Sequence, residues 1–189
     1  MNPVAENASI GKSCQIERLF NHCFREEALT VLIGGVTEPI YLPALSATGL
    51  SFLFYREDYV SSALHEVAHW CLAGEHRRQK RDYGYWYIPP NRSPSQQLAF
   101  EVVEVQPQAL EWIFSLAAEV SFNLSLDSSD SESDLRTSTF GMAVSKQARR
   151  FCRQGLPERA ALFFEELARC FGTNHDLRAI ISCFDGSLQ

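Results

Sequence analysis

The chain has 189 residues, of which 46% are hydrophobic and 21% are charged, the balance of an ordinary soluble globular protein. Its net charge of -6 argues against a non-specific nucleic-acid binder, which would carry a basic surface. No apolar run approaches the roughly 20 residues of a membrane span, and the start of the chain lacks the pattern of a secretory signal. We therefore expect a cytoplasmic protein whose partners are neither nucleic acid nor membrane.

The first third of the chain predicts a leader, a helix and a small sheet. Residues 1–12 show no apolar periodicity, so we expect a flexible leader followed by a single catalytic domain over 13–189. Apolar residues recur at helical spacing after Ser13, and short apolar or β-branched runs follow them. These patterns predict a helix at 13–27 and extended segments at 30–35, 38–44 and 50–55.

The remainder of the chain is mainly helical in pattern, which makes the expected fold class α+β. Pro107 interrupts one helical pattern, so that segment is either a kinked helix or two helices. Residues 121–139 are rich in serine and acidic residues and predict an acidic surface loop. Helices are predicted at 58–76, 96–120, 140–154, 157–171 and 173–184, and an extended aromatic segment with a loop at 82–95. The six cysteines form no CxxC pair and are expected to be reduced thiols.

The stretch HEVAH, at residues 65 to 69, is the strongest chemical signal in the sequence. His65 and His69 are four residues apart, so on a helix their imidazoles point from one face toward one place. This HExxH arrangement is typical of a metal site. The bland alternative is that two histidines occur there by chance and Glu66 only supports the helix. The apolar character of the segment favours a metal, because buried imidazole nitrogens need partners.

Two histidines leave a metal ion under-coordinated, so a third ligand is expected. Glu101, Glu104, Gln108 and Glu111 follow one stripe of the helical pattern at 96–120. An isolated stripe of this kind is more often a solvated face, but its neighbours here are apolar. Glu104 lies between two valines and is the expected ligand, with Glu101 as a second-sphere residue or alternative ligand. His22, His76 and His175 also compete, but His76 lies in a charged segment that we expect to be exposed.

Two histidines and one carboxylate serve two chemistries. With zinc, Glu66 would activate a bound water and the protein would be a metallopeptidase. With Fe(II), the open coordination positions suit a two-histidine, one-carboxylate oxygenase. The spacing of the ligands does not decide between these metals.

Several longer motifs are more specific to one protein family than HExxH is. They are AxHExxHWCxAGxxRR at 63–78, DYGYWYxP at 82–89 and FExVEVQPQALEWxF at 100–114, with EPIYLPA at 38–44 and GLPERAALF at 155–163. In this order they resemble the bacterial elongation factor P hydroxylase family, from about residue 16 to about residue 170. The leader, the acidic loop and the C-terminal tail depart from the family pattern.

The resemblance implies an iron- and oxygen-dependent enzyme of the monooxygenase type. Its substrate would be a lysine of translation elongation factor P, usually one that already carries a β-lysyl group. The family lacks the double-stranded β-helix of 2-oxoglutarate oxygenases, and this sequence has no HxD pair and is strongly helical. Carried over to this sequence, the metal ligands are His65, His69 and Glu104, and Glu66 supports the site or transfers a proton.

An aromatic run follows the HExxH helix. Tyr83, Tyr85, Trp86 and Tyr87 suit either ordinary core packing or a cleft that holds a cationic lysine by cation–π contact. The basic run from Arg77 to Arg81 suits either a solvated helix end or a docking site for an acidic partner.

Overall fold

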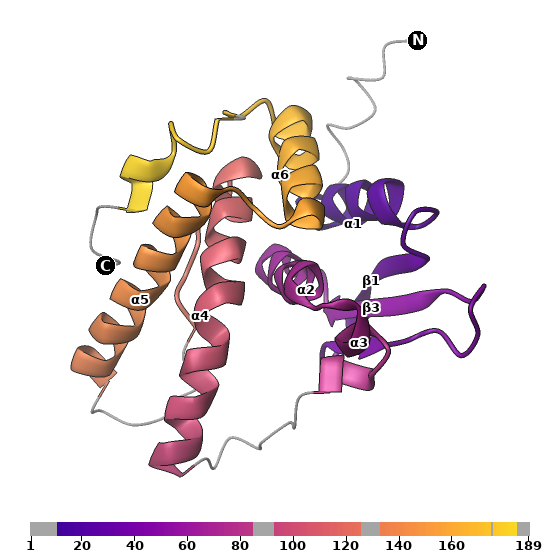
Figure 1. The fold of residues 1–189 in the computed structure, drawn as a ribbon. Helices are drawn as coiled ribbons and strands as arrows, with labels where there is room; N and C mark the ends of the chain where they lie inside the picture. Colours follow the sequence, from indigo (N-terminus) through magenta and orange to yellow (C-terminus); the bar gives the residue numbers. More distant parts are fainter. Residues whose placement is uncertain (1–10, 85–92, 126–132, 175, 185–189) are drawn as a thin grey trace. The chain divides into compact units, whose positions relative to one another are not determined.

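The computed structural model describes residues 11–84, 93–125, 133–174 and 176–184. The contacts between residues divide the chain into two compact units, Met1–Gly84 and Tyr85–Gln189 (Figure 1). Most of the predicted leader lies outside the described residues. The single catalytic domain expected over 13–189 stays a prediction.

The first unit combines a small mixed sheet with helices. The strands β1 (Thr30–Val36), β2 (Ile40–Leu42) and β3 (Ser51–Arg56) lie in the order β1-β3-β2. β1 pairs with β3 in parallel and β2 pairs with β3 antiparallel. The helical elements are α1 (Lys12–Phe24), α2 (Val60–Leu72), α3 (Glu75–Arg78) and the 3-10 turn η2 (Arg81–Gly84). The predicted fold class, mainly helical α+β with a small sheet and no double-stranded β-helix, is confirmed in the described residues.

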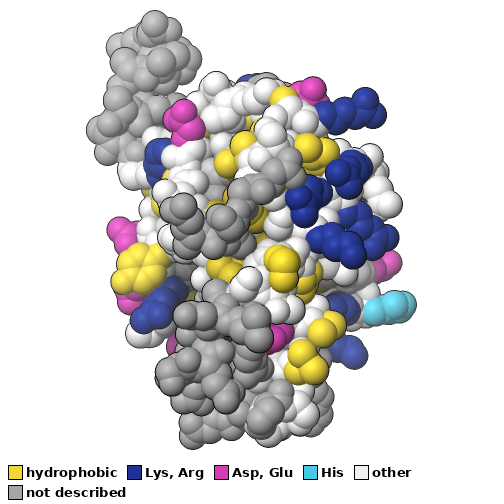
Figure 2. All heavy atoms as spheres, turned by 90° about the vertical axis from the view of Figure 1, so that its left-hand side faces the viewer, with side chains coloured by type: hydrophobic (Ala, Val, Ile, Leu, Met, Phe, Trp, Pro, Cys, Tyr) yellow, Lys and Arg dark blue, Asp and Glu magenta, His cyan; other side chains and the backbone are white. Residues whose placement is uncertain are grey.

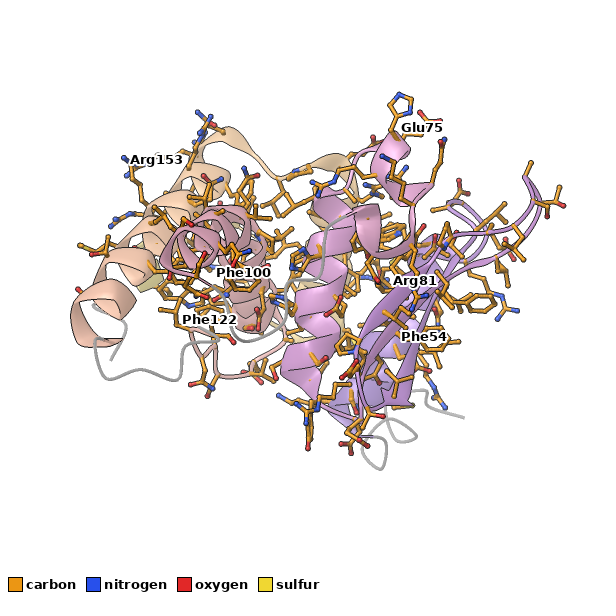
Figure 3. All side chains as sticks on the ribbon, turned by 90° about the horizontal axis from the view of Figure 1, so that it is seen from below. Phe54, Glu75, Arg81, Phe100, Phe122 and Arg153 are labelled. Atoms are coloured by element: carbon orange, nitrogen blue, oxygen red, sulfur yellow. The ribbon has the colours of Figure 1, made fainter. Side chains whose placement is uncertain are left out.

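The core of the first unit lies on one face of this sheet. Along β3, Ser51, Leu53 and Tyr55 are buried, while Phe52 and Phe54 between them are only half-buried (Figure 3). Successive strand residues point to opposite faces, so this alternation marks one covered and one more open face. α1 packs against β1 and α2 packs against β3, which supplies the cover.

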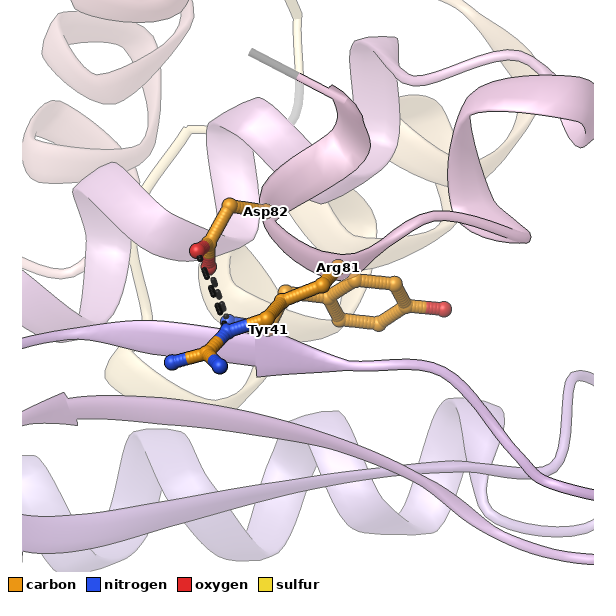
Figure 4. A network of polar contacts seen from close by, with 3 residues as sticks. All are labelled: Tyr41, Arg81 and Asp82. Atoms are coloured by element: carbon orange, nitrogen blue, oxygen red, sulfur yellow. Dashed lines mark hydrogen bonds and ion pairs between the residues drawn. The ribbon is translucent and has the colours of Figure 1, made fainter. Parts of the chain in front are cut away.

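Side chains from the helical elements form hydrogen bonds with backbone groups at the outer edges of the sheet. On β1, the Asn21 amide of α1 donates to the Leu32 carbonyl at 3.1 Å and accepts from the Leu32 N–H at 2.7 Å. The Glu17 carboxylate accepts from the Gly34 N–H at 3.0 Å. On β2, the Asp82 carboxylate of η2 accepts from the Tyr41 N–H at 3.0 Å (Figure 4). An edge strand left open is a template for pairing with another chain, and these side chains block it.

The second unit is helical in the described residues. It contains α4 (Pro94–Ala117), α5 (Ser133–Gln154), α6 (Glu158–Phe171) and the 3-10 turn η3 (Ile181–Phe184). A capping box between Ser93 and Gln96 starts α4. Both α5 and α6 pack against α4, and Trp112 of α4 stacks on Phe122, which Figure 3 labels. Pro107 lies inside α4, so the segment that the sequence left open is one continuous helix.

Three predicted boundaries differ from the structure. The helix predicted at 58–76 ends earlier, because Ala73 is extended and its carbonyl accepts from the Arg78 guanidinium. α5 begins at Ser133, inside the loop predicted at 121–139, since polar composition alone does not exclude a helix. The helix predicted at 173–184 is reduced to turns and η3, after Gly172 ends α6 in the left-handed conformation.

The surface of the described residues mixes charged and apolar side chains. Figure 2 shows hydrophobic side chains exposed among lysines and arginines on one face, and Leu98, Val102 and Met142 are each more than half exposed. Among the described helices, none combines the length and apolarity that crossing a membrane requires. All six cysteines are free, in agreement with the prediction of reduced thiols.

The amide of Asn21 gives a direct test of the edge contacts. We expect Asn21→Ala to lower the free energy of unfolding by about 1–3 kcal/mol, because it leaves backbone groups of the buried Leu32 without their partner. Urea denaturation measures the change. Arg18→Ala, at an exposed position on the same helix, is the control and should stay within about 0.5 kcal/mol of the parent protein. Equal effects of the two substitutions would contradict the role given to Asn21.

Candidate metal centre

The histidine pair stands on α2, whose other side is buried. Ala63, Leu64, Val67 and Ala68 are buried together with Trp70 and Cys71, so the helix is fixed along this stripe. His65 and His69 are half-buried beside the stripe. Their Nε2 atoms lie 3.1 Å apart, and the planes of their rings cross at 71°. The predicted convergence of the two imidazoles from neighbouring turns is confirmed.

The distance between these two nitrogens fits metal coordination. Two nitrogens that each lie about 2.1 Å from one ion, at an angle between 90° and tetrahedral, are roughly 3.0–3.4 Å apart. The same separation also suits a hydrogen bond between one protonated and one unprotonated ring nitrogen when no ion is bound. The rings therefore stand ready for a shared ion without a change of the helix backbone.

Glu66 and Cys71 are the other reactive groups on α2. Glu66 is half-buried, and its carboxylate raises the pKa of the Tyr83 phenol, second only to the effect of burial. Burial raises the pKa of the Cys71 thiol well above its ordinary value. A cysteine binds metal as the thiolate, so Cys71 is not a suitable ligand in this environment.

In the second unit, α4 carries the expected carboxylate ligand. Glu104 is 6% exposed, and the Gln108 amide one turn later donates to its Oε2 at 3.5 Å. Gln108 is fixed in turn, because its amide donates to the Ser125 carbonyl at 2.7 Å and accepts from the Ser125 N–H at 3.1 Å. The Glu104 carboxylate thus has a neighbour whose own orientation is set by the backbone. Gln108 belongs to the polar stripe of the helical pattern at 96–120, but the spacing of that stripe does not indicate this role.

Glu101 is the more accessible of the two candidate carboxylates. It is half-buried and accepts a hydrogen bond from the Gln97 amide at 3.3 Å. The expectation that apolar neighbours mark a buried environment was wrong for this turn, because Val102 and Val103 are exposed. Glu104 is buried because its own side of α4 is covered, and the valines beside it in sequence point elsewhere.

The remaining candidate residues are either exposed, buried or outside the described residues. His22 and His76 are exposed, as expected for His76, and His175 lies outside the described residues. Tyr85, Trp86 and Tyr87, expected to line a substrate cleft, also lie outside them. Tyr83 is described, and it is deeply buried.

Comparison with known proteins identifies the family of this chain. A model of the elongation factor P hydroxylase family matches residues 19–180. A relative from Haemophilus influenzae named elongation factor P lysine hydroxylase is 42% identical over 159 residues, which cover 84% of this chain and 89% of that protein. The matched segment contains His65, His69 and Glu104. The chain therefore belongs to the elongation factor P hydroxylase family.

Proposed function

We propose that this protein hydroxylates a lysine side chain of translation elongation factor P. Its family and the name of its relative from Haemophilus influenzae support this activity and substrate. The observation on the molecule that carries the proposal is the convergence of the His65 and His69 nitrogens at 3.1 Å. Hydroxylation of a lysine methylene needs a cofactor that activates dioxygen, because no protein side chain does so alone, and a redox-active metal ion held by these nitrogens would supply it.

The proposed ligands are His65, His69 and Glu104. They offer two imidazole nitrogens and one carboxylate oxygen, a donor set that leaves coordination positions open. The burial of Glu104 and its contact with the fixed Gln108 amide favour it over Glu101, which remains the alternative.

The proposed metal is Fe(II). Zinc has no redox chemistry, so it does not suit the insertion of oxygen into a carbon–hydrogen bond. When bound, a ferrous ion supplies the electron transfer that activates dioxygen for this reaction. The described residues do not form the double-stranded β-helix of 2-oxoglutarate oxygenases, which favours a monooxygenase type without that cosubstrate.

The other residues of the chain would bind and orient the substrate. Glu66 is placed on α2 directly after His65 and is proposed to hold or move a proton during the reaction. Tyr85, Trp86 and Tyr87 are proposed to receive the cationic side chain, lysine or β-lysyl-lysine, by cation–π contact. The net charge of -6 favours the approach of that cation, and a translation factor as substrate favours a cytoplasmic location.

The alternative function is a zinc-dependent HExxH peptidase. It differs in the use of Glu66, which would be the central base that activates water. In the hydroxylase, Glu66 assists a reaction whose oxygen atom comes from dioxygen. Substitution of this residue separates the two functions.

Mass spectrometry of elongation factor P tests the function itself. In cells that lack this protein, we expect elongation factor P to lose the mass of one oxygen atom on its modified lysine. The parent protein should restore that mass, whereas His65→Ala should not, because the ion loses one of its imidazole ligands. An unchanged mass in the deletion strain would contradict the proposed function.

Paired carboxylate substitutions test the third ligand. We expect Glu104→Gln to weaken Fe(II) binding by more than the roughly 10–100-fold that follows loss of a hydrogen-bond partner of a ligand. Glu101→Gln, a change of the same size on the neighbouring turn, should alter binding less than about threefold if Glu101 is not a ligand. Titration of the metal-free protein with Fe(II) under anaerobic conditions measures both. The opposite ranking would assign the ligand to Glu101.

The Glu66→Gln variant distinguishes the hydroxylase from the peptidase. A general base contributes about 10²–10⁴-fold to a rate, so a peptidase would lose nearly all cleavage of a peptide substrate. For the hydroxylase we expect a slower reaction, by about 10–100-fold, that still adds one oxygen atom to elongation factor P. The readouts are peptide cleavage by the zinc-loaded protein and hydroxylation by the iron-loaded protein. Cleavage by the parent protein that disappears in the variant would support the peptidase.

A further inference from the structure

Tyr83 carries a buried hydroxyl group that no other described group uses. The residue is 5% exposed, and within the described part of the chain its hydroxyl oxygen has no hydrogen-bond partner. Two other buried tyrosines of the first unit differ, because Tyr41 donates to the Arg78 carbonyl and Tyr55 donates to the Glu17 carboxylate. A buried hydroxyl without a partner destabilises a protein, so a phenylalanine would serve better if only packing mattered.

The backbone that carries Tyr83 is strained. Asp82 has φ of 49° and Tyr83 has φ of 58°, so two consecutive non-glycine residues adopt the left-handed conformation. Such residues are uncommon and persist only where the surroundings hold them. Strain of this kind is concentrated at functional sites, although strain by itself assigns no role.

Contacts around the turn hold it in this conformation. The Asp82 carboxylate accepts from the Tyr41 N–H and lies 3.7 Å from the Arg81 guanidinium (Figure 4). The Tyr83 carbonyl accepts from the Arg77 guanidinium at 3.3 Å. The Tyr83 ring stacks on the Tyr41 ring, with centroids 4.6 Å apart and planes 13° from parallel. The position of the phenol is therefore fixed by the sheet and by the segment that follows α3.

The charged neighbour of this phenol is Glu66. Burial raises the pKa of Tyr83 well above its ordinary value, and the Glu66 carboxylate raises it further, ahead of Tyr41, Cys71 and Asp82. The hydroxyl thus stays protonated and is available as a hydrogen-bond donor. Glu66 is half-buried and its side chain has several rotatable bonds, so their torsion angles set the distance between its oxygens and the fixed donor.

We propose that Tyr83 is a positioning residue for Glu66, and that its fixed hydroxyl donates a hydrogen bond to the Glu66 carboxylate during the reaction. The inference rests on the proposed function, in which Glu66 holds or moves a proton beside the histidine pair. A neutral donor restricts the rotation of the carboxylate without adding a charge next to the metal ligands. This role also accounts for an unpaired buried hydroxyl on a strained turn.

The Tyr83→Phe variant tests the proposal, because it removes only the hydroxyl and keeps the stacked ring. We expect kcat for hydroxylation of elongation factor P to fall by about tenfold or more, with KM changed less than twofold. The melting temperature of the metal-free variant should equal or exceed that of the parent, because a buried hydroxyl without a partner has been removed. In the Glu66→Ala background, which has no acceptor for the phenol, the same substitution should cause no further loss of kcat.

Tyr55→Phe is the matched control. Its hydroxyl already donates to the Glu17 carboxylate, so its removal should lower the melting temperature and leave kcat unchanged. A kcat for Tyr83→Phe within twofold of the parent would overturn the proposal, as would a loss of kcat that persists in full in the Glu66→Ala background. Failure of the parent protein to add oxygen to elongation factor P would instead contradict the proposed function, so the two failures are distinguishable.

Discussion

The burial of Trp70 is the interaction on which the first unit depends. Its side chain is fully buried and contacts the rings of Phe20 and Phe24 of α1, with centroids 5.0 and 4.7 Å away. Trp70 directly follows His69, and one residue corresponds to about 100° of rotation around a helix. A tryptophan held in the core therefore fixes the rotation of α2, and with it the direction of both imidazoles. The tryptophan of the HExxHW motif therefore has a structural role, because it orients the helix that carries the two histidines.

The second unit controls its carboxylate by a different means. Pro107 provides no N–H for the carbonyl of Val103, yet α4 runs through it without a break, supported by packing against α5 and α6. One residue later, Gln108 connects the helix to the backbone of Ser125 and contacts Glu104. The turn that contains the proline is thus stabilised by a side chain that also orients a carboxylate. In both units, the residue that secures the fold is next in sequence to a proposed ligand or one turn away from it.

Local patterns predicted the elements but not their ends or their strained turns. Helical spacing was sufficient for the convergence of His65 and His69, because residues four apart always share a helix face. The burial of Glu104 was predicted correctly from a wrong premise, since neighbouring valines in a helix point in other directions. The left-handed conformation of Tyr83 was beyond prediction. It depends on the contact between Asp82 and Tyr41, which are 41 residues apart in the chain.

The buried thiol of Cys71 has a consequence for the durability of the protein under the proposed oxygen-dependent reaction. Cys71 lies two residues after His69, on the buried side of α2. Oxidation to sulfenic and sulfinic acids proceeds through the thiolate and requires access by the oxidant. Burial of Cys71 prevents both, because it shields the sulfur from the oxidant and disfavours loss of the thiol proton. The core that supports the histidines would thereby resist oxidation during the proposed oxygen-dependent reaction.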